Sequence, residues 1–217
     1  AKPAEIWNGF NEGFWGADFS GRMLEAYSRL ALSGVRSDRI DEIGKNLLAR
    51  QSLDGCFHNG KASSSYEKEA GFWFGNARGM MGLLWAYEFS RDSSYLKAAI
   101  DLGDYYVATY FNTKRHKAPG SFSWVATEAM AALYALTREE RFLELAVQIA
   151  QSIPPVFMKS QHTHSYLLSI RGIVQIYEQT GDTALLNKAL RQYEVFQDKI
   201  MWPGGGIVEH LGNPASY

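Results

Sequence analysis

Three copies of one ten-residue pattern show how this chain folds: YEFSRDSSYL at 87–96, YALTREERFL at 134–143 and YEQTGDTALL at 177–186. Successive copies start 47 and 43 residues apart, which is the period of a helix-pair repeat. Each copy begins with a tyrosine that ends an apolar helix face, and a Ser or Thr follows three residues later. The pattern then offers an acidic residue that can cap the next helix, namely Asp92, Glu139 or Asp182.

Apolar residues on both sides of each copy recur at helical spacing. Before the first copy they include Met80, Leu83 and Leu84, and after it Ala99 and Ile100. The same spacing surrounds the other two copies. A further pair of helices precedes the first copy and is joined by a different turn, SGVRSD at 33–38. We therefore predict four helical hairpins, with helices at 15–34 and 37–51, 70–90 and 93–112, 121–136 and 139–153, and 162–179 and 183–200.

The first helix of each predicted hairpin differs in character from the second. First helices open with aromatic and polar residues, as in FWGAD at 14–18 and FWFGN at 72–76, whereas second helices are rich in Lys, Arg and Glu. This asymmetry predicts an all-α toroid of the (α/α)6 barrel type, with first helices inside and second helices outside. Four hairpins fall short of six, so we expect residues 1–217 to form a single domain that is part of a larger barrel.

Bulk properties argue against several classes of partner. The formal net charge is −1 and the only basic cluster is KRHK at 114–117, so nucleic acid is not expected as a partner. No apolar run approaches the ~20 residues that span a bilayer, so no membrane association is expected. The single Cys56 excludes an internal disulfide. The sequence does not indicate an oligomeric state.

The aromatic content favours a cavity with flat, amphipathic walls. Aromatic residues make up 14% of the chain, and such side chains suit the apolar faces of sugar rings, although they can also simply fill a core. Arg78 and Glu128 could hydrogen-bond sugar hydroxyls, or they could form buried ion pairs between hairpins. The residues that could contact a sugar on or near the predicted first helices are Trp15, Asp18, Trp73, Asn76, Arg78 and Trp124.

Glu209 is the strongest candidate for acid–base chemistry. It follows the GGG turn at 204–206, which allows close approach of the backbone, and stands beside His210 in a segment without helical periodicity. A carboxylate on a loop over an aromatic cavity suits general acid or base catalysis at a glycosidic bond. The alternative is a surface glutamate on a flexible tail.

Histidine and cysteine offer weaker candidates. His162 and His164 begin the seventh predicted helix at a spacing that does not share one helix face, so each could contact sugar hydroxyls, cap the helix or fill the core. Cys56 lies near His58 and could act as a nucleophile, although an incidental thiol is the simpler interpretation. No HExxH or paired CxxC spacing occurs, so we expect no metal site within these residues.

Several segments resemble the β-L-arabinofuranosidase family, glycoside hydrolase family 127. GFWFGNARGMMGLLWAYE at 71–88 resembles its second inner helix, and 124–145 is similar to the next hairpin. The stretch 162–186, followed by GGGIVE at 204–209, is similar to the region leading to the acid/base glutamate of the family. The resemblance covers most of the chain.

The resemblance implies an (α/α)6 catalytic barrel followed by β-sandwich domains, and a retaining mechanism with a zinc-bound cysteine as nucleophile. Only Glu209 matches a catalytic position, that of the general acid/base. Cys56 is not at a matching place, so the zinc ligands would lie in a cysteine-rich segment after Tyr217. Ala77-Arg78 stands where the family often shows a basic pair, which weakens the expectation of a sugar contact there.

Together these observations predict a glycoside hydrolase with a carbohydrate substrate, and the resemblance suggests an arabinofuranoside. A second reading is an unsaturated-uronide hydrolase or sugar epimerase, in which Asp18 or the pair His162 and His164 transfers protons. A third is a non-enzymatic helical-repeat module that binds a protein on an open concave face.

Overall fold

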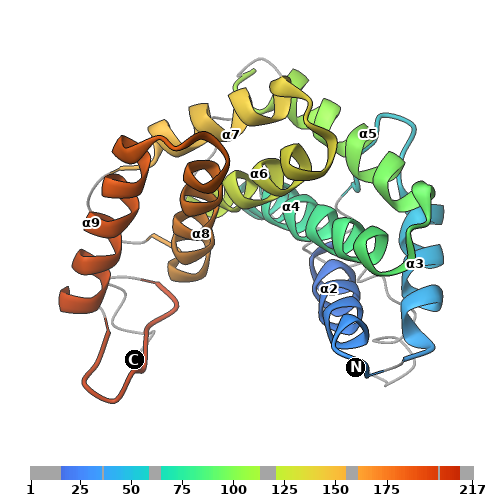
Figure 1. Cartoon of the computed structure of the whole chain (residues 1–217), viewed down its shortest axis with the longest axis horizontal. Coiled ribbons are helices and arrows are strands. Elements are labelled where there is room, and N and C mark those ends of the chain that lie inside the picture. The colour runs from blue at the N-terminus through green and yellow to red at the C-terminus, as the bar shows by residue number, and fades with distance from the viewer. Residues whose placement is uncertain are drawn as a thin grey trace. The chain divides into compact units, whose positions relative to one another are not determined.

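The computed structural model describes residues 16–35, 37–58, 65–112, 121–154, 161–199 and 201–210 (Figure 1). The chain consists of two compact units, Ala1–Pro119 and Gly120–Tyr217, and each is described by itself. Among the described residues, no helix is both long and apolar enough to cross a bilayer.

Each unit contains two helical hairpins, as the repeat predicts. The first unit holds α2 (Asp18–Leu32), α3 (Arg39–Arg50), α4 (Ser65–Ser90) and α5 (Ser93–Thr109). The second holds a 3-10 helix η1 (Ser121–Val125), then α6 (Ala126–Thr137), α7 (Glu140–Ser152), α8 (Thr163–Thr180) and α9 (Thr183–Lys199).

Two helix starts differ from the prediction. Helix α4 begins at Ser65 and not at residue 70, because the polar stretch SYEKEA contains good helix formers although it lacks an apolar face. The helix predicted from residue 121 begins as η1 and becomes α-helical at Ala126. The other predicted boundaries agree with the structure to within a few residues.

The repeated pattern forms the same turn three times. In each copy the Ser or Thr hydroxyl donates to the carbonyl oxygen four residues earlier, at 2.7, 2.9 and 2.8 Å, and accepts the N–H two residues later. The residue that follows the Ser or Thr has a left-handed backbone conformation, which ends the helix. These residues are Arg91 (φ 58°), Arg138 (φ 60°) and Gly181 (φ 73°).

The predicted caps form at two of the three copies. Asp92 accepts the Ser94 N–H at 2.9 Å, which lowers the pKa of the Asp92 carboxyl, and Asp182 accepts the Ala184 N–H at 2.9 Å. Glu139 makes no such bond, and the prediction that it caps α7 is wrong. Its longer side chain forms an ion pair with Arg141 instead.

Within each unit, the first helices of neighbouring hairpins pack backbone against backbone. Helix α2 lies on α4, where a Cβ atom on Gly82 would come within 2.5 Å of the Gly21 carbonyl oxygen. Helix α8 lies on α6, where a Cβ atom on Gly172 would come within 2.5 Å of the Glu128 backbone nitrogen. Only glycine permits these approaches, so these positions fix which helices are neighbours.

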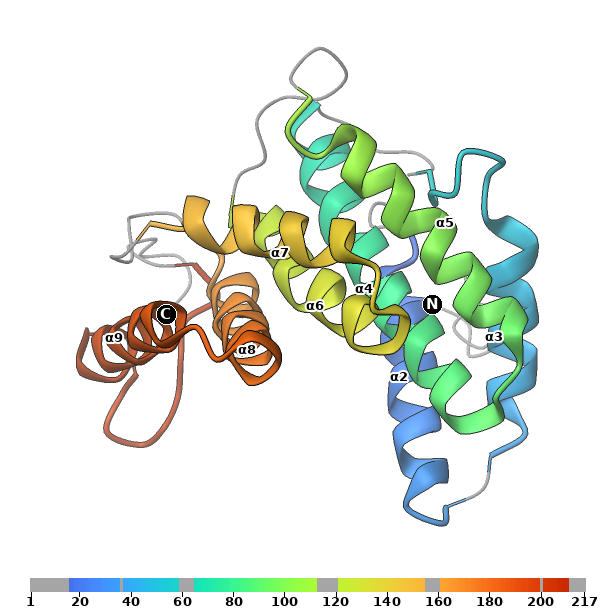
Figure 2. The ribbon, with the colours of Figure 1, turned by 45° about the horizontal axis from the view of Figure 1, so that its top comes forward.

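The second helices pack against the outside of these pairs. Figure 2 shows α5 alongside α4 in the first unit, where the Tyr106 hydroxyl on α5 donates to the Trp73 carbonyl oxygen on α4 at 2.6 Å, and α3 packs mainly on α2. In the second unit, α7 packs on α6 and α9 on α8. The Lys188 ammonium on α9 donates to the carbonyl oxygens of Ala150 at 2.6 Å and Ile153 at 2.8 Å, so it caps the end of α7.

Residues 51–58, which follow α3, are fixed against their neighbours by two side-chain amides, those of the buried Asn76 and the half-buried Gln51. The Oδ1 atom of Asn76 accepts the Phe57 N–H at 2.7 Å, and Nδ2 donates to the carbonyl oxygens of Phe57 at 2.8 Å and Phe72 at 2.9 Å. The Nε2 atom of Gln51 donates to the Ala98 carbonyl oxygen on α5 at 2.8 Å. Residues 51–58 are therefore bound to α5 through Gln51 and to α4 through Asn76.

Replacing Gly172 by alanine tests the packing of α8 on α6. In an open helix this change would stabilise by about 1 kcal/mol, but here the new methyl group meets backbone, and we expect a loss of about 2–3 kcal/mol. Urea unfolding measures the free energy. Gly204→Ala, where the methyl group meets nothing within 4 Å, is the control and should change stability little. A neutral or stabilising Gly172→Ala would contradict the packing.

Replacing Asn76 by alanine tests the attachment of the segment before α4. The change leaves the backbone groups of Phe57 and Phe72 without their partner, so we expect a loss of about 2–4 kcal/mol in the free energy of unfolding. Hydrogen exchange should also become faster at the Phe57 amide. Asn187→Ala, on the exposed side of α9, serves as the control. Unchanged exchange at Phe57 would show that Asn76 does not hold this segment.

Candidate active site

The segment 201–210 folds back onto the start of α8 and carries Glu209 to that place. His162 and His210 form an isolated antiparallel bridge, and the Thr163 N–H donates to the Glu209 carbonyl oxygen at 2.9 Å. The backbone around Glu209 is thus tied to the first residues of α8, while the Glu209 side chain is 74% exposed. The predicted acid/base residue combines a fixed backbone with an accessible carboxylate.

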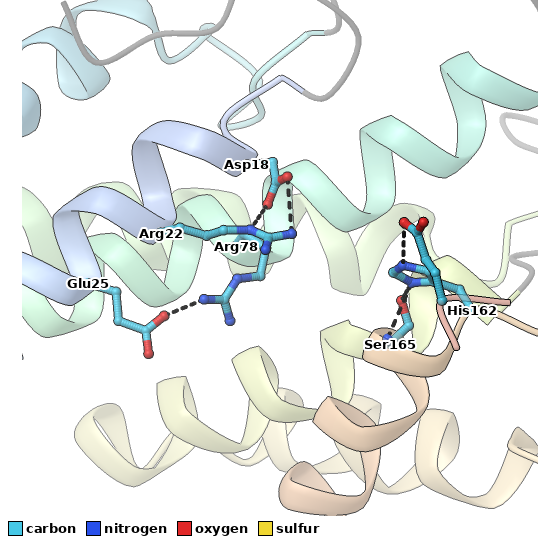
Figure 3. Close-up of polar contacts among 7 residues, drawn as sticks. Asp18, Arg22, Glu25, Arg78, His162 and Ser165 are labelled. Atoms are coloured by element: carbon cyan, nitrogen blue, oxygen red, sulfur yellow. Dashed lines mark hydrogen bonds and ion pairs between the residues drawn. The ribbon is translucent and has the colours of Figure 1, made fainter. Parts of the chain in front are cut away.

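His162 connects this carboxylate to the helix. Its Nδ1 atom accepts the Ser165 N–H at 3.3 Å as the N-cap of α8 and lies 2.7 Å from the Ser165 hydroxyl (Figure 3). In the neutral ring the proton therefore resides on Nε2. That nitrogen lies 4.0 Å from Oε1 of Glu209, and the His162 side chain is only 7% exposed. The arrangement points a buried N–H at an exposed carboxylate.

Aromatic rings surround His162 on several sides. Phe122 of η1 stacks on it with a centroid distance of 4.3 Å and an interplanar angle of 23°. The rings of His210 and His164 lie at 5.3 and 6.0 Å. Phe122 was not among the sequence candidates, although the aromatic opening of the helix predicted from residue 121 contains it. These rings hold the plane of the imidazole and cover most of its surface from solvent.

Trp124 packs inward in the same unit. It is buried, and its ring meets the Tyr166 ring edge-on at 6.3 Å. Burial also raises the pKa of the Tyr166 hydroxyl to about 12, which keeps this group protonated at neutral pH. The contacts of Trp124 are those of a core residue, and stacking on a sugar stays a prediction.

In the first unit, Asp18 and Arg78 belong to two adjoining ion pairs (Figure 3). Asp18 accepts from Arg22 Nε at 2.6 Å, and Arg78 Nη2 donates to Glu25 Oε2 at 2.6 Å across the packing of α4 on α2. Burial raises the pKa of Asp18, and the neighbouring Arg22 and Arg78 oppose the shift.

Ion pairs form between hairpins at both predicted positions; the pair of Arg78 is buried as predicted, whereas Glu128 is buried but its partner Arg171 is half exposed. Arg78 joins α4 to Glu25 on α2, with both side chains less than 10% exposed. Arg171 on α8 lies 2.7 Å from Oε1 of the fully buried Glu128 on α6. A buried charge without its partner is costly, so each pair selects the correct neighbouring helix.

The remaining sequence candidates of the first unit have structural contacts. Trp73 is 1% exposed and meets the rings of Tyr106 and Tyr110 edge-on, at 5.1 and 5.0 Å. The Asn76 amide is occupied by backbone groups of the segment before α4, as described above. These contacts explain why both side chains are buried, and a sugar contact by either stays a prediction. Trp15 lies outside the described residues.

Cys56 lies between Asp54 and His58. Its Sγ atom is 3.2 Å from Asp54 Oδ1 and 3.5 Å from His58 Nε2, and the residue is fully buried. Burial and the neighbouring carboxylate raise the pKa of the thiol well above its usual range. The thiol is therefore protonated and a poor nucleophile. Asp54 was not among the sequence candidates, although it lies two residues before Cys56 just as His58 lies two residues after it.

Comparisons with solved structures find the same fold in several sugar-acting proteins. A glycoside hydrolase family 127 β-arabinofuranosidase aligns over 96% of this chain and 40% of its own, with a TM-score of 0.71 and 15% identity. A D-mannose isomerase (TM-score 0.69, 14% identity) aligns over 90% of this chain and 63% of its own. An unsaturated glucuronyl hydrolase specific for heparin (TM-score 0.69, 12% identity) aligns over 88% and 64%.

These likenesses establish the fold, an all-α arrangement of the (α/α)6 type, as predicted. The chain spans 40–64% of the length of these three structures. No curated protein matches the sequence. The family model for the catalytic domain of β-L-arabinofuranosidase, glycoside hydrolase family 127, matches residues 1–214. The chain therefore belongs to glycoside hydrolase family 127, as its inner-helix and GGGIVE segments suggested.

Proposed function

We propose that this chain contributes the general acid/base, Glu209, to a glycoside hydrolase that cleaves an arabinofuranoside. The observation that carries the proposal is the position of Glu209, whose backbone is bound to the start of α8 while its carboxylate is exposed and faces the Nε2 atom of His162. Membership of a glycoside hydrolase family supports an enzyme over a helical-repeat binding module.

In this mechanism the Glu209 carboxyl protonates the oxygen of the leaving group and then, as a carboxylate, takes a proton from the attacking water. The His162 N–H favours the carboxylate that forms after the first step, and it orients this group. The separation of 4.0 Å is longer than a hydrogen bond, and catalytic hydrogen bonds often tighten only when substrate is bound.

A retaining course needs a second group as nucleophile. The single cysteine of this chain, Cys56, is not at the position where the resemblance places the zinc-bound nucleophile, and its protonated thiol is a poor nucleophile as long as no metal is bound to it. We assign no step to such a centre here. We propose that the nucleophile comes from sequence outside these 217 residues, which is consistent with the partial coverage of the relatives.

Glu209→Gln in the full polypeptide that carries this chain tests the acid/base role. We expect kcat to fall by about 10²–10⁴-fold on aryl β-L-arabinofuranosides with a poor leaving group, because protonation is lost. The loss should be much smaller in the first step on dinitrophenyl substrates, which need little protonation. Glu194→Gln, on the exposed surface of α9, is the matched control. Unchanged turnover, or a loss independent of the leaving group, would remove Glu209 from this role.

A second candidate function is supported by the raised pKa of Asp18. A partly buried carboxyl of this kind, beside Arg22 and Arg78, suits the proton transfers of an unsaturated-uronide hydrolase or sugar epimerase. In that reading Asp18 is catalytic and Glu209 is dispensable. In the glycosidase reading Asp18 acts only in substrate binding.

Asp18→Asn separates the two readings. For the glycosidase we expect a higher KM, by about tenfold, with kcat nearly unchanged, because only a binding contact is lost. The measurement is full kinetics on the aryl arabinofuranoside, together with assays on an unsaturated glucuronide and on a free aldose. Loss of kcat in Asp18→Asn combined with full activity of Glu209→Gln would favour the second function.

A further inference from the structure

The segment before α4 carries three side chains whose ligand atoms converge on one point. Asp54, Cys56 and His58 offer a carboxylate, a thiol and an imidazole, and all their ligand atoms lie within 4.8 Å of one another. Asp54 lies in a turn closed by the Gly55 N–H, which donates to the Ser52 carbonyl oxygen at 2.9 Å, and the left-handed backbone of Gly55 (φ +87°) leads from this turn to Cys56 and His58. Phe57 is fully buried and its ring lies near Gly79 on α4.

The distances within this group match the edges of a metal coordination polyhedron. Zinc bonds of about 2.3 Å to sulfur and about 2.0–2.2 Å to nitrogen or oxygen, at tetrahedral angles, put neighbouring ligand atoms about 3.4–3.6 Å apart. Here Sγ is 3.2 Å from the Asp54 carboxylate and 3.5 Å from His58 Nε2, and Nε2 is 3.4 Å from the other Asp54 oxygen. A small movement would place the sulfur, the imidazole nitrogen and one carboxylate oxygen around a single ion.

A catalytic triad would require a different arrangement. In a triad the carboxylate binds one imidazole nitrogen and the nucleophile binds the other. Here His58 Nε2 is the nearer nitrogen to the Cys56 sulfur, at 3.5 Å against 3.8 Å for Nδ1, and it also lies closest to Asp54. Convergence of both partners on one nitrogen is the geometry of a shared ion.

The scaffold around the group is rigid. Gly55 has φ +87°, and a Cβ atom there would collide with the Asp101 carbonyl oxygen, so the turn lies directly on α5. The Ser52 N–H donates to the Cys56 carbonyl oxygen at 2.9 Å, and Asn76 holds the next residue. The Tyr105 hydroxyl also hydrogen-bonds the Cys56 sulfur. Supporting contacts of this kind orient ligands before a metal binds.

We propose that Asp54, Cys56 and His58 bind a divalent transition-metal ion of the zinc class. The sulfur, the imidazole and the carboxylate supply three positions, and solvent or a further ligand takes the fourth. The exposed side chains of Asp54 (47%) and His58 (60%) give the ion access from solution, while Cys56 forms the buried base. Binding releases the thiol proton to solvent. This site is separate from the ligand set that the family resemblance places after Tyr217.

Cobalt(II) titration of the metal-free full chain tests the proposal. Because Cys56 is the only cysteine of these 217 residues, the part of the thiolate-to-cobalt charge-transfer band that Cys56→Ser removes comes from Cys56. We expect the band to saturate at one equivalent and zinc to displace it. Cys56→Ser should abolish the band, and Asp54→Asn and His58→Gln should each weaken binding by about tenfold or more.

His164→Gln and Asp104→Asn are the matched controls and should bind as the wild type does. Zinc should also raise the Tm of the wild type and of both controls, but not that of His58→Gln. This second readout uses an exposed side chain, so it stands even if Cys56→Ser folds poorly. Absence of the band, or metal binding that is insensitive to Cys56→Ser and His58→Gln, would overturn the proposal. None of these outcomes depends on glycosidase activity.

Discussion

Close approach of backbone to backbone between first helices is the constraint on which each unit depends. Helices α2 and α4 meet through Gly21 and Gly82, and α6 and α8 meet through Gly172. The close approach brings Arg78 to Glu25 and Arg171 to Glu128. Each of the two glycine-containing helix contacts therefore also contains an ion pair. The lack of a side chain at these glycines sets the distance between the helices, and the need to pair the buried carboxylates of Glu25 and Glu128 favours the correct partner helix and register.

The periodicity of the sequence was sufficient to predict the hairpins. The tyrosine-to-leucine pattern predicted where helices end, because a Ser or Thr hydroxyl and a left-handed residue are local devices that act within one turn. Glu139 shows the limit of that reasoning: an acidic residue at the capping position does not cap when its side chain is too long and a neighbouring Arg141 is available. Local sequence gives the position of a turn more reliably than its hydrogen bonds.

The candidate site was harder to predict, because burial depends on contacts between distant segments. Trp73 and Asn76 are residue types expected in a sugar-binding site, yet Trp73 packs on α5 and Asn76 hydrogen-bonds the segment before α4. The same residue types serve both purposes, and sequence spacing cannot separate them. Phe122 and Asp54 were missed for the opposite reason: each gains importance only from a partner in space, His162 for one and Cys56 for the other.

The geometry of His162 also bears on which group transfers protons. Its Nδ1 lone pair accepts the Ser165 N–H, so the neutral ring has no free lone pair, and its remaining N–H points at Glu209. To act as a base, His162 would have to release the cap of α8 or lose its Nε2 proton, and both changes are costly. As a donor it needs neither change. The cap of α8 therefore suits His162 to a positioning role, which is consistent with the proposal that Glu209 transfers the proton.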